Sequence, residues 1–143
     1  MKYTALLSFL TFCACNTPKE NLTGTYKLLS STIKVKGDTA KPLPMANQEM
    51  IKIFDGTHFA FFRHDLSHGK GADSLYESGG GTYTLSGENY TEHLAYCGAR
   101  EWEGHDFNFT LEHHGDSLFQ KGIEKVEGQN IDREILEIYI KLP

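Results

Sequence analysis

Cysteine is scarce in this 143-residue chain, which carries only three and has no C-x-x-C pair. Three cysteines are too few for a disulfide scaffold, and without such a pair they offer little for a thiolate zinc cluster. Basic residues are also in deficit, with 14 Lys and Arg against 19 Asp and Glu and a net charge of -5. Because a nucleic-acid groove needs clustered Lys and Arg, we expect no nucleic-acid partner.

Helical periodicity is missing as well. No window of helical length shows a hydrophobic period of 3.6 residues, whereas short alternating or aromatic runs recur between turn residues. The length suits one domain. We therefore expect an all-β domain with eight strands, at residues 24–36, 49–54, 57–64, 80–86, 89–97, 105–114, 117–125 and 132–142.

Tight and long connections alternate along these strands. In an up-and-down meander, successive connections fall at opposite ends, so one end would hold every tight turn and the other every long loop. This asymmetry predicts an eight-stranded up-and-down antiparallel barrel with room for side chains or one small ligand. The glycine-bearing tight pairs are Asp55-Gly56, Gly87-Glu88 and Gly115-Asp116, and the long connections are residues 37–48, 65–79, 98–104 and 126–131.

The N-terminal residues are typical of an export signal. Lys2 precedes an apolar run at residues 4–12 that is too short to span a bilayer. Ala14 followed by Cys15 is similar to a bacterial lipoprotein processing site. Residues 1–14 are therefore predicted to be a lipoprotein signal peptide.

The same resemblance implies how the mature protein is attached. Cys15 would be the lipidated N-terminus, residues 15–21 would hold it on a polar tether, and residues 22–143 would form the barrel. The domain would then be exported and lipid-anchored to a bacterial membrane, the outer membrane, on its periplasmic or surface side. Two alternatives are acceptance of the lipid by Cys13, which bulky Phe12 disfavours, and an ordinary secretory signal cut near the same place.

Five short segments carry a resemblance to a known family. They are residues 22–28, 58–63, 79–85, 89–92 and 137–141. In this order they resemble the lipocalin-like (calycin) proteins, and more narrowly the small exported lipocalin-like lipoproteins of Bacteroidetes-type bacteria. The resemblance implies a barrel that binds a small molecule, without implying a cofactor.

Hairpin register indicates which side chains point inward. Pairing Ser86 with Asn89 puts Tyr83 beside Glu92 on an aromatic face that continues to Tyr96. The bulkier face of residues 49–64 groups Lys52 with three phenylalanines and Arg63. The inward face of residues 105–125 groups Gln120 with Phe109. By resemblance to fatty-acid-binding calycins, whose last strand presents Arg and Tyr to the ligand, Glu137 and Tyr139 are placed inside. The expected ligand-binding residues are Phe59, Phe61, Arg63, Tyr83, Glu92, Tyr96, Phe109, Glu137 and Tyr139.

Two interpretations of this interior remain open. An unpaired charge in such a space is costly, so Arg63 needs Glu92, Glu137 or an anionic group of a ligand. The barrel is then either plugged by its own charged side chains or hollow, with an aromatic pocket and a polar end.

Sequence motifs of catalysis are missing. The chain has no nucleophile elbow, P-loop, dinucleotide fingerprint or HExxH, so we expect no enzyme, no cofactor and no metal. His64, His68, Cys97 and His105 fall near the long-loop end, where a metal site is geometrically allowed, but solvated histidines are favoured. We expect a membrane-anchored protein that binds a small, partly apolar ligand. The alternative is a protein- or glycan-interaction module that uses the long loops, where Trp102 either closes the mouth or packs on a partner.

Overall fold

The structure is a computed structural model that describes residues 22–36, 38–42 and 46–143. The predicted signal peptide and Cys15 lie outside the described residues. Within them, no helix is long and apolar enough to cross a membrane. The elements are β1 (Thr23–Val35), β2 (Lys41–Pro42), β3 (Gln48–Asp55), β4 (His58–Asp65), β5 (Tyr76–Ser86), β6 (Asn89–Cys97), the short helix η1 (Arg100–Trp102), β7 (His105–His114), β8 (Ser117–Val126) and β9 (Ile131–Lys141).

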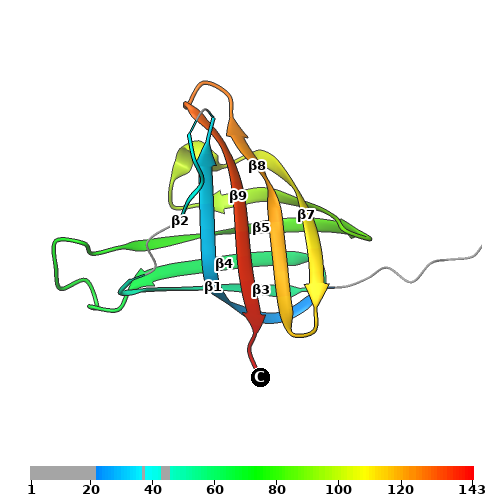
Figure 1. The fold of residues 1–143 in the computed structure, drawn as a ribbon, viewed down its shortest axis with the longest axis horizontal. Helices are drawn as coiled ribbons and strands as arrows, with labels where there is room; N and C mark the ends of the chain where they lie inside the picture. Colours follow the sequence, from blue (N-terminus) through cyan, green and yellow to red (C-terminus); the bar gives the residue numbers. More distant parts are fainter. Residues whose placement is uncertain (1–21, 37, 43–45) are drawn as a thin grey trace, which may run out of the picture.

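Eight long strands close into a barrel, as the sequence predicts. Each pairs antiparallel with the next long strand along the chain, from β3 to β9. β1 closes the ring because its Thr23–Lys27 part pairs with β3 and its Tyr26–Val35 part pairs with β9. Figure 1 shows β1 and β9 side by side although they come from opposite ends of the sequence. The two-residue β2 adds to β1 outside this ring.

The tight turns gather at one end, which we call the closed end. Gly56, Gly87 and Gly115 all adopt positive φ angles, between 58° and 98°, which glycine tolerates and other residues rarely adopt. Asp55 also accepts hydrogen bonds from the backbone N–H groups of Thr57 and His58, at 2.8 and 2.7 Å. These hydrogen bonds hold the pKa of the Asp55 carboxyl at about 2. The first turn is therefore held by a side chain as well as by its glycine.

A run of three glycines sets the path of β5 and β6. β5 begins at Tyr76 rather than near residue 80, because the run lies inside the strand and is not a loop. A side chain at Gly81 would meet the carbonyl oxygen of His93, and one at Gly80 would meet that of Phe59. Only glycine permits this close approach, and the register shifts here, so that Gly81 faces Leu94 and Gly80 faces Tyr96.

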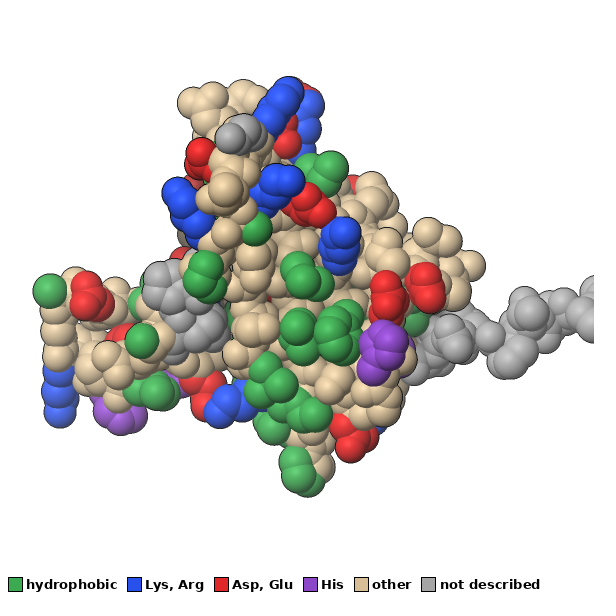
Figure 2. Space-filling view, in the orientation of Figure 1, with side chains coloured by type: hydrophobic (Ala, Val, Ile, Leu, Met, Phe, Trp, Pro, Cys, Tyr) green, Lys and Arg blue, Asp and Glu red, His purple; other side chains and the backbone are tan. Residues whose placement is uncertain are grey.

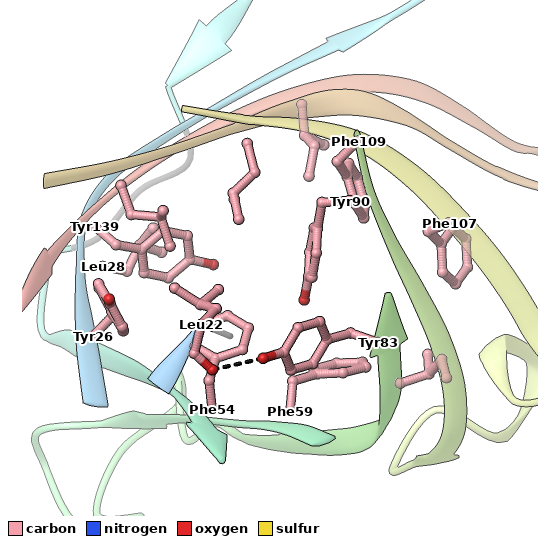
Figure 3. Packing of buried hydrophobic residues seen from close by; sticks show 14 of the residues in the cluster. Leu22, Tyr26, Leu28, Phe54, Phe59, Tyr83, Tyr90, Phe107, Phe109 and Tyr139 are labelled. Atoms are coloured by element: carbon pink, nitrogen blue, oxygen red, sulfur yellow. Dashed lines mark hydrogen bonds between the residues drawn. The ribbon is translucent and has the colours of Figure 1, made fainter. Parts of the chain in front are cut away.

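The closed half of the barrel is filled by aromatic side chains. The ring of Phe54 lies edge-on to those of Tyr26 and Tyr83, with centroids 5.7 and 5.6 Å apart. Figure 3 shows these rings pointing into the barrel from separate strands, together with Phe59 and Tyr90. The hydroxyl of Tyr83 donates a 2.6 Å hydrogen bond to the carbonyl oxygen of Leu22, which ties the start of the domain to this core.

Apolar side chains also lie on the outer surface. Figure 2 shows a group of them over the face that β1 and β9 form, where Leu29 and Leu136 are exposed. Alternation in β9 is therefore not a simple apolar-in and polar-out pattern. The inward set of this strand includes Glu137 and Tyr139, and the outward set includes Leu136.

Candidate functional site

The open half of the barrel encloses a cavity of about 440 Å³. Its volume lies within the range of about 300–1,000 Å³ that is typical of small-molecule pockets. Inward side chains of the strands and the segment 99–102 form its wall. The lining residues are Ser31, Ile33, Met50, Lys52, Phe61, Arg63, Glu77, Ser78, Glu92, Leu94, Cys97, Ala99, Glu101, Trp102, Phe107, Gln120, Glu124, Arg133, Ile135 and Glu137.

A buried lysine separates this cavity from the aromatic core. The Lys52 ammonium forms an ion pair with Glu92 and donates a 3.0 Å hydrogen bond to Oε1 of Gln120. The Tyr90 hydroxyl donates a 2.9 Å hydrogen bond to the same Glu92 carboxylate. Lys52 comes from β3, Glu92 from β6 and Gln120 from β8, so these contacts join strands that are not neighbours in the sheet. We call Lys52, Glu92, Gln120 and Glu137 the polar layer.

Aromatic rings surround the Lys52 ammonium on the side of the closed half. Its Nζ atom lies 5.2–5.9 Å from the ring centroids of four aromatic side chains. Burying a charge is costly unless it is paired, and here a carboxylate, an amide oxygen and the ring faces together replace water. The four rings belong to Phe54, Phe59, Tyr90 and Tyr139.

The two arginines of the cavity are paired with carboxylates as well. The Arg63 guanidinium donates a 3.2 Å hydrogen bond to Glu77 and also binds Oε1 of Gln48. The Nε atom of Arg133 lies 2.6 Å from Oε2 of Glu124, and its guanidinium lies 5.0 Å from the ring centroid of Trp102. Burial raises the pKa of the Glu124 carboxyl despite the opposing charge of Arg133.

Glu137 differs from Glu92, the other carboxylate of the polar layer. Its Oε2 atom accepts a 2.6 Å hydrogen bond from the Tyr139 hydroxyl. Among the described residues it forms no ion pair, and Lys52 is engaged by Glu92 and Gln120 instead. Burial raises the pKa of the Glu137 carboxyl, although the charge of Lys52 and the Tyr139 hydrogen bond act in the opposite direction.

The predicted ligand-binding residues fall into three groups. Phe61, Arg63, Glu92 and Glu137 line the cavity. Phe59, Tyr83, Phe109 and Tyr139 point inward but are buried in the packed core. Tyr96 points outward and is 74 % exposed, so its predicted inward orientation is wrong, because the bulge opposite Gly80 and Gly81 reverses the alternation beyond Leu94.

The partner expected for Arg63 is also different in the structure. Its carboxylate is Glu77, whereas Glu92 pairs with Lys52. Alternation places Lys52 and Gln120 on inner faces, but the ion pair to Glu92 depends on which strands face each other across the barrel. Glu124 and Arg133 were missed entirely. Alternation could have found both, because Glu124 lies four residues after Gln120 on β8 and Arg133 lies four residues before Glu137 on β9.

Residues near the mouth hold the long loop before β7 in place. The Cys97 N–H donates a 2.9 Å hydrogen bond to Glu103, and Nδ1 of His105 faces the carbonyl oxygens of Trp102 and Glu103 at 3.2 and 3.0 Å. Trp102 packs on Phe107 and lines the cavity. Burial raises the pKa of the Cys97 thiol, which disfavours a thiolate.

The histidines form no metal centre in the part of the chain that is described. In residues 22–36, 38–42 and 46–143, no three His, Cys, Asp or Glu side chains come together in a group that could hold a metal ion. His64 at the end of β4 and His68 in the connection from β4 to β5 line a surface pocket with Asp65. His105, the first residue of β7, instead faces the carbonyl oxygens of Trp102 and Glu103.

The chain matches no family model, no curated protein and no solved structure. The closed antiparallel barrel is compatible with a lipocalin-like fold.

Proposed function

We propose that this protein is a lipocalin-like carrier that binds one small, partly apolar molecule in the open half of its barrel. The observation that carries the proposal is the cavity of about 440 Å³ beyond the polar layer. Apolar walls from Ile33, Phe61 and Leu94 alternate with charged side chains, which is the usual composition of a small-ligand site. No catalytic role is proposed for these residues.

The wall around the cavity favours binding inside the barrel over a partner on the loops. Trp102, the single tryptophan of the chain, packs on Phe107 and Arg133 and lines the cavity. A side chain held in this way forms part of the wall of the pocket. The interaction-module alternative therefore has less support.

The chain termini of the barrel suggest its orientation on a membrane. β1 begins opposite Asp55 and β9 ends beside β8 near Ser117, so the N-terminal start of the domain lies at the closed end. If Cys15 carries a lipid, the seven residues to Leu22 span at most roughly 25 Å. We propose that the closed end faces the membrane and that the mouth of the cavity faces away from it.

Trp102 provides a built-in reporter for testing the proposal. We expect the neutral fluorophore N-phenyl-1-naphthylamine to bind the full chain with a stoichiometry of one and to quench the fluorescence of Trp102. Ile135→Phe replaces a cavity-lining side chain by a bulkier aromatic one and should abolish saturable binding of the fluorophore. The experiment is a fluorescence titration followed by displacement with unlabelled compounds.

The matched control lies on the same strand. Leu136→Phe makes the same change in type on the outer face of β9 and should leave binding unchanged. Circular dichroism and the denaturation midpoint would establish that both variants fold. Equal binding by both variants, or no saturable binding by the unmodified chain, would refute the cavity as the binding site.

A further inference from the structure

We infer that the ligand of this cavity carries a protonated amine, which binds the carboxylate of Glu137 while an apolar body fills the rest of the space. The inference rests on the proposed function and names the chemical class of ligand. It concerns the charges that face the cavity, where carboxylates and cations are unequal in number.

Every cationic side chain that lines the cavity already has a carboxylate partner. An anionic ligand at Lys52 or Arg133 would have to displace Glu92 or Glu124 and leave that carboxylate largely buried without its cation. The carboxylate of Arg63, Glu77, is half exposed, so only at Arg63 would displacement be less costly. An anionic head group is therefore disfavoured. The pairs are Lys52–Glu92, Arg63–Glu77 and Arg133–Glu124.

Carboxylates exceed cations in the lining by five to three, which leaves Glu101 and Glu137 over. Glu101 is exposed at the mouth, where water solvates its charge. Glu137 lies in the polar layer, in register with Gln120 on β8, and among the described residues it forms no ion pair. A ligand cation at this position would supply the missing charge and could donate hydrogen bonds to the carboxylate.

The surroundings of Glu137 keep its carboxylate available from the cavity side. The Tyr139 hydroxyl approaches from the packed core and occupies one carboxylate oxygen, Oε2. The carboxylate also lines the cavity, so a ligand can reach it. Burial raises the pKa of this carboxyl, and a bound cation would favour its ionised form.

Apolar side chains form another part of the wall. Ile33, Met50, Phe61 and Leu94 face the cavity from β1, β3, β4 and β6. They favour a ligand whose amine is attached to a hydrocarbon or ring system over a polar polyamine. Together with Glu137, they define an amphiphilic amine.

The experiment compares three octyl compounds that differ only in the head group, namely octylammonium, octanol and octanoate. Their binding to the full chain is measured at pH 7 by displacement of N-phenyl-1-naphthylamine and by Trp102 fluorescence. We expect octylammonium to bind about tenfold more tightly than octanol, and octanoate to bind most weakly. This ranking needs no variant and therefore does not depend on how a substitution folds.

Two charge-matched variants locate the effect. Glu137→Gln keeps an acceptor for the Tyr139 hydroxyl and should remove the preference for octylammonium over octanol. Glu134→Gln removes the same charge from the outer face of β9 and should leave the preference intact. Loss of the preference in Glu134→Gln as well would show that only the overall charge matters and would overturn the assignment to Glu137.

The outcomes separate this inference from the proposed function. If the fluorophore and octanol bind but octanoate equals or exceeds octylammonium, the cavity binds ligands and the amine inference is wrong. The amine inference is also wrong if Glu137→Gln retains the full preference. If neither the fluorophore nor any octyl compound binds, the proposed function fails and the inference fails with it.

Discussion

The closed and open halves of the barrel are built from the same strands yet differ in what fills them. In the closed half, inward positions carry rings that pack against one another, as Phe54 does with Tyr26 and Tyr83. In the open half, inward positions carry long charged side chains around a cavity of about 440 Å³. The strand pattern that builds a packed core at one end therefore builds a hollow at the other.

The transition takes place within two residues on several strands. Phe54 is followed inward by Lys52 on β3, Tyr90 by Glu92 on β6, and Tyr139 by Glu137 on β9. The polar layer satisfies its charges mainly within itself, so it can form a floor without a ligand. This division suggests that stability comes mainly from the closed half and that ligand binding belongs to the open half.

The largest effect should come from breaking the polar layer at the boundary. Lys52→Met leaves Glu92 buried without its cation and should lower the free energy of unfolding by about 3–5 kcal/mol. The double variant Lys52→Met with Glu92→Leu removes both charges and should recover most of this loss. Urea denaturation followed by circular dichroism measures both. A double variant that is less stable than Lys52→Met would show that the ion pair does not act as a unit.

The next effect comes from two phenylalanines of the β3–β4 hairpin, of which Phe54 is buried in the packed core and Phe61 lines the cavity. Phe54→Ala opens a void in close-packed surroundings and should cost about 3–5 kcal/mol. Phe61→Ala enlarges a space that is already hollow and should cost only about 1–2 kcal/mol. Ligand binding should show the reverse order. At temperatures where both variants are folded, Phe61→Ala should weaken the affinity for the fluorophore and Phe54→Ala should hardly change it.

Equal destabilisation by the two substitutions would contradict the division into a packed and a hollow half. The denaturation midpoints and the fluorophore titrations can be measured on the same samples. Ala60 is next to Phe61 on β4 and points to the opposite face of the strand. Ala60→Gly therefore provides a control for a loss of strand propensity alone.

The strands and the closed barrel could be predicted because they depend on local signals. Alternating side chains and glycine-bearing turns such as Asp55-Gly56 set strand length, hairpin register and the end at which the loops gather. Glu92 was placed inside for the same reason, whereas Glu137 was placed inside by resemblance to fatty-acid-binding calycins, because alternation alone left its strand ambiguous. Tyr96 was also predicted to point inward, and this prediction is wrong because one extra residue opposite Gly80 and Gly81 reverses the face of the residues beyond Leu94.

The pairing of charges could not be predicted in the same way. Lys52 and Glu92 lie 40 positions apart in sequence on strands that are not neighbours, and their contact depends on how the barrel closes. Alternation gives the face of a residue but not its height relative to strands across the interior. The cavity is likewise a consequence of packing, because its volume depends on which long side chains turn toward one another and which line the wall.

The smallest expected effect concerns the pH dependence of stability at Glu137. Burial raises the folded-state pKa of this carboxyl above its ordinary value of 4.5, so the folded state holds its proton to higher pH than the unfolded state. The resulting contribution is neutral below about pH 4.5 and becomes destabilising as pH rises through the folded-state pKa, where each unit of difference is worth about 1.4 kcal/mol. Glu137→Gln should therefore be more stable than the unmodified chain at pH 8, and this advantage should vanish near pH 4. Urea denaturation across this range measures the difference, with Glu134→Gln as the outer-face control. If the stability advantage of Glu137→Gln were as large at pH 4 as at pH 8, or larger, the ionised carboxylate of Glu137 would not destabilise the fold. The contrast between a stabilising closed half and a binding open half would then lose its support at this residue.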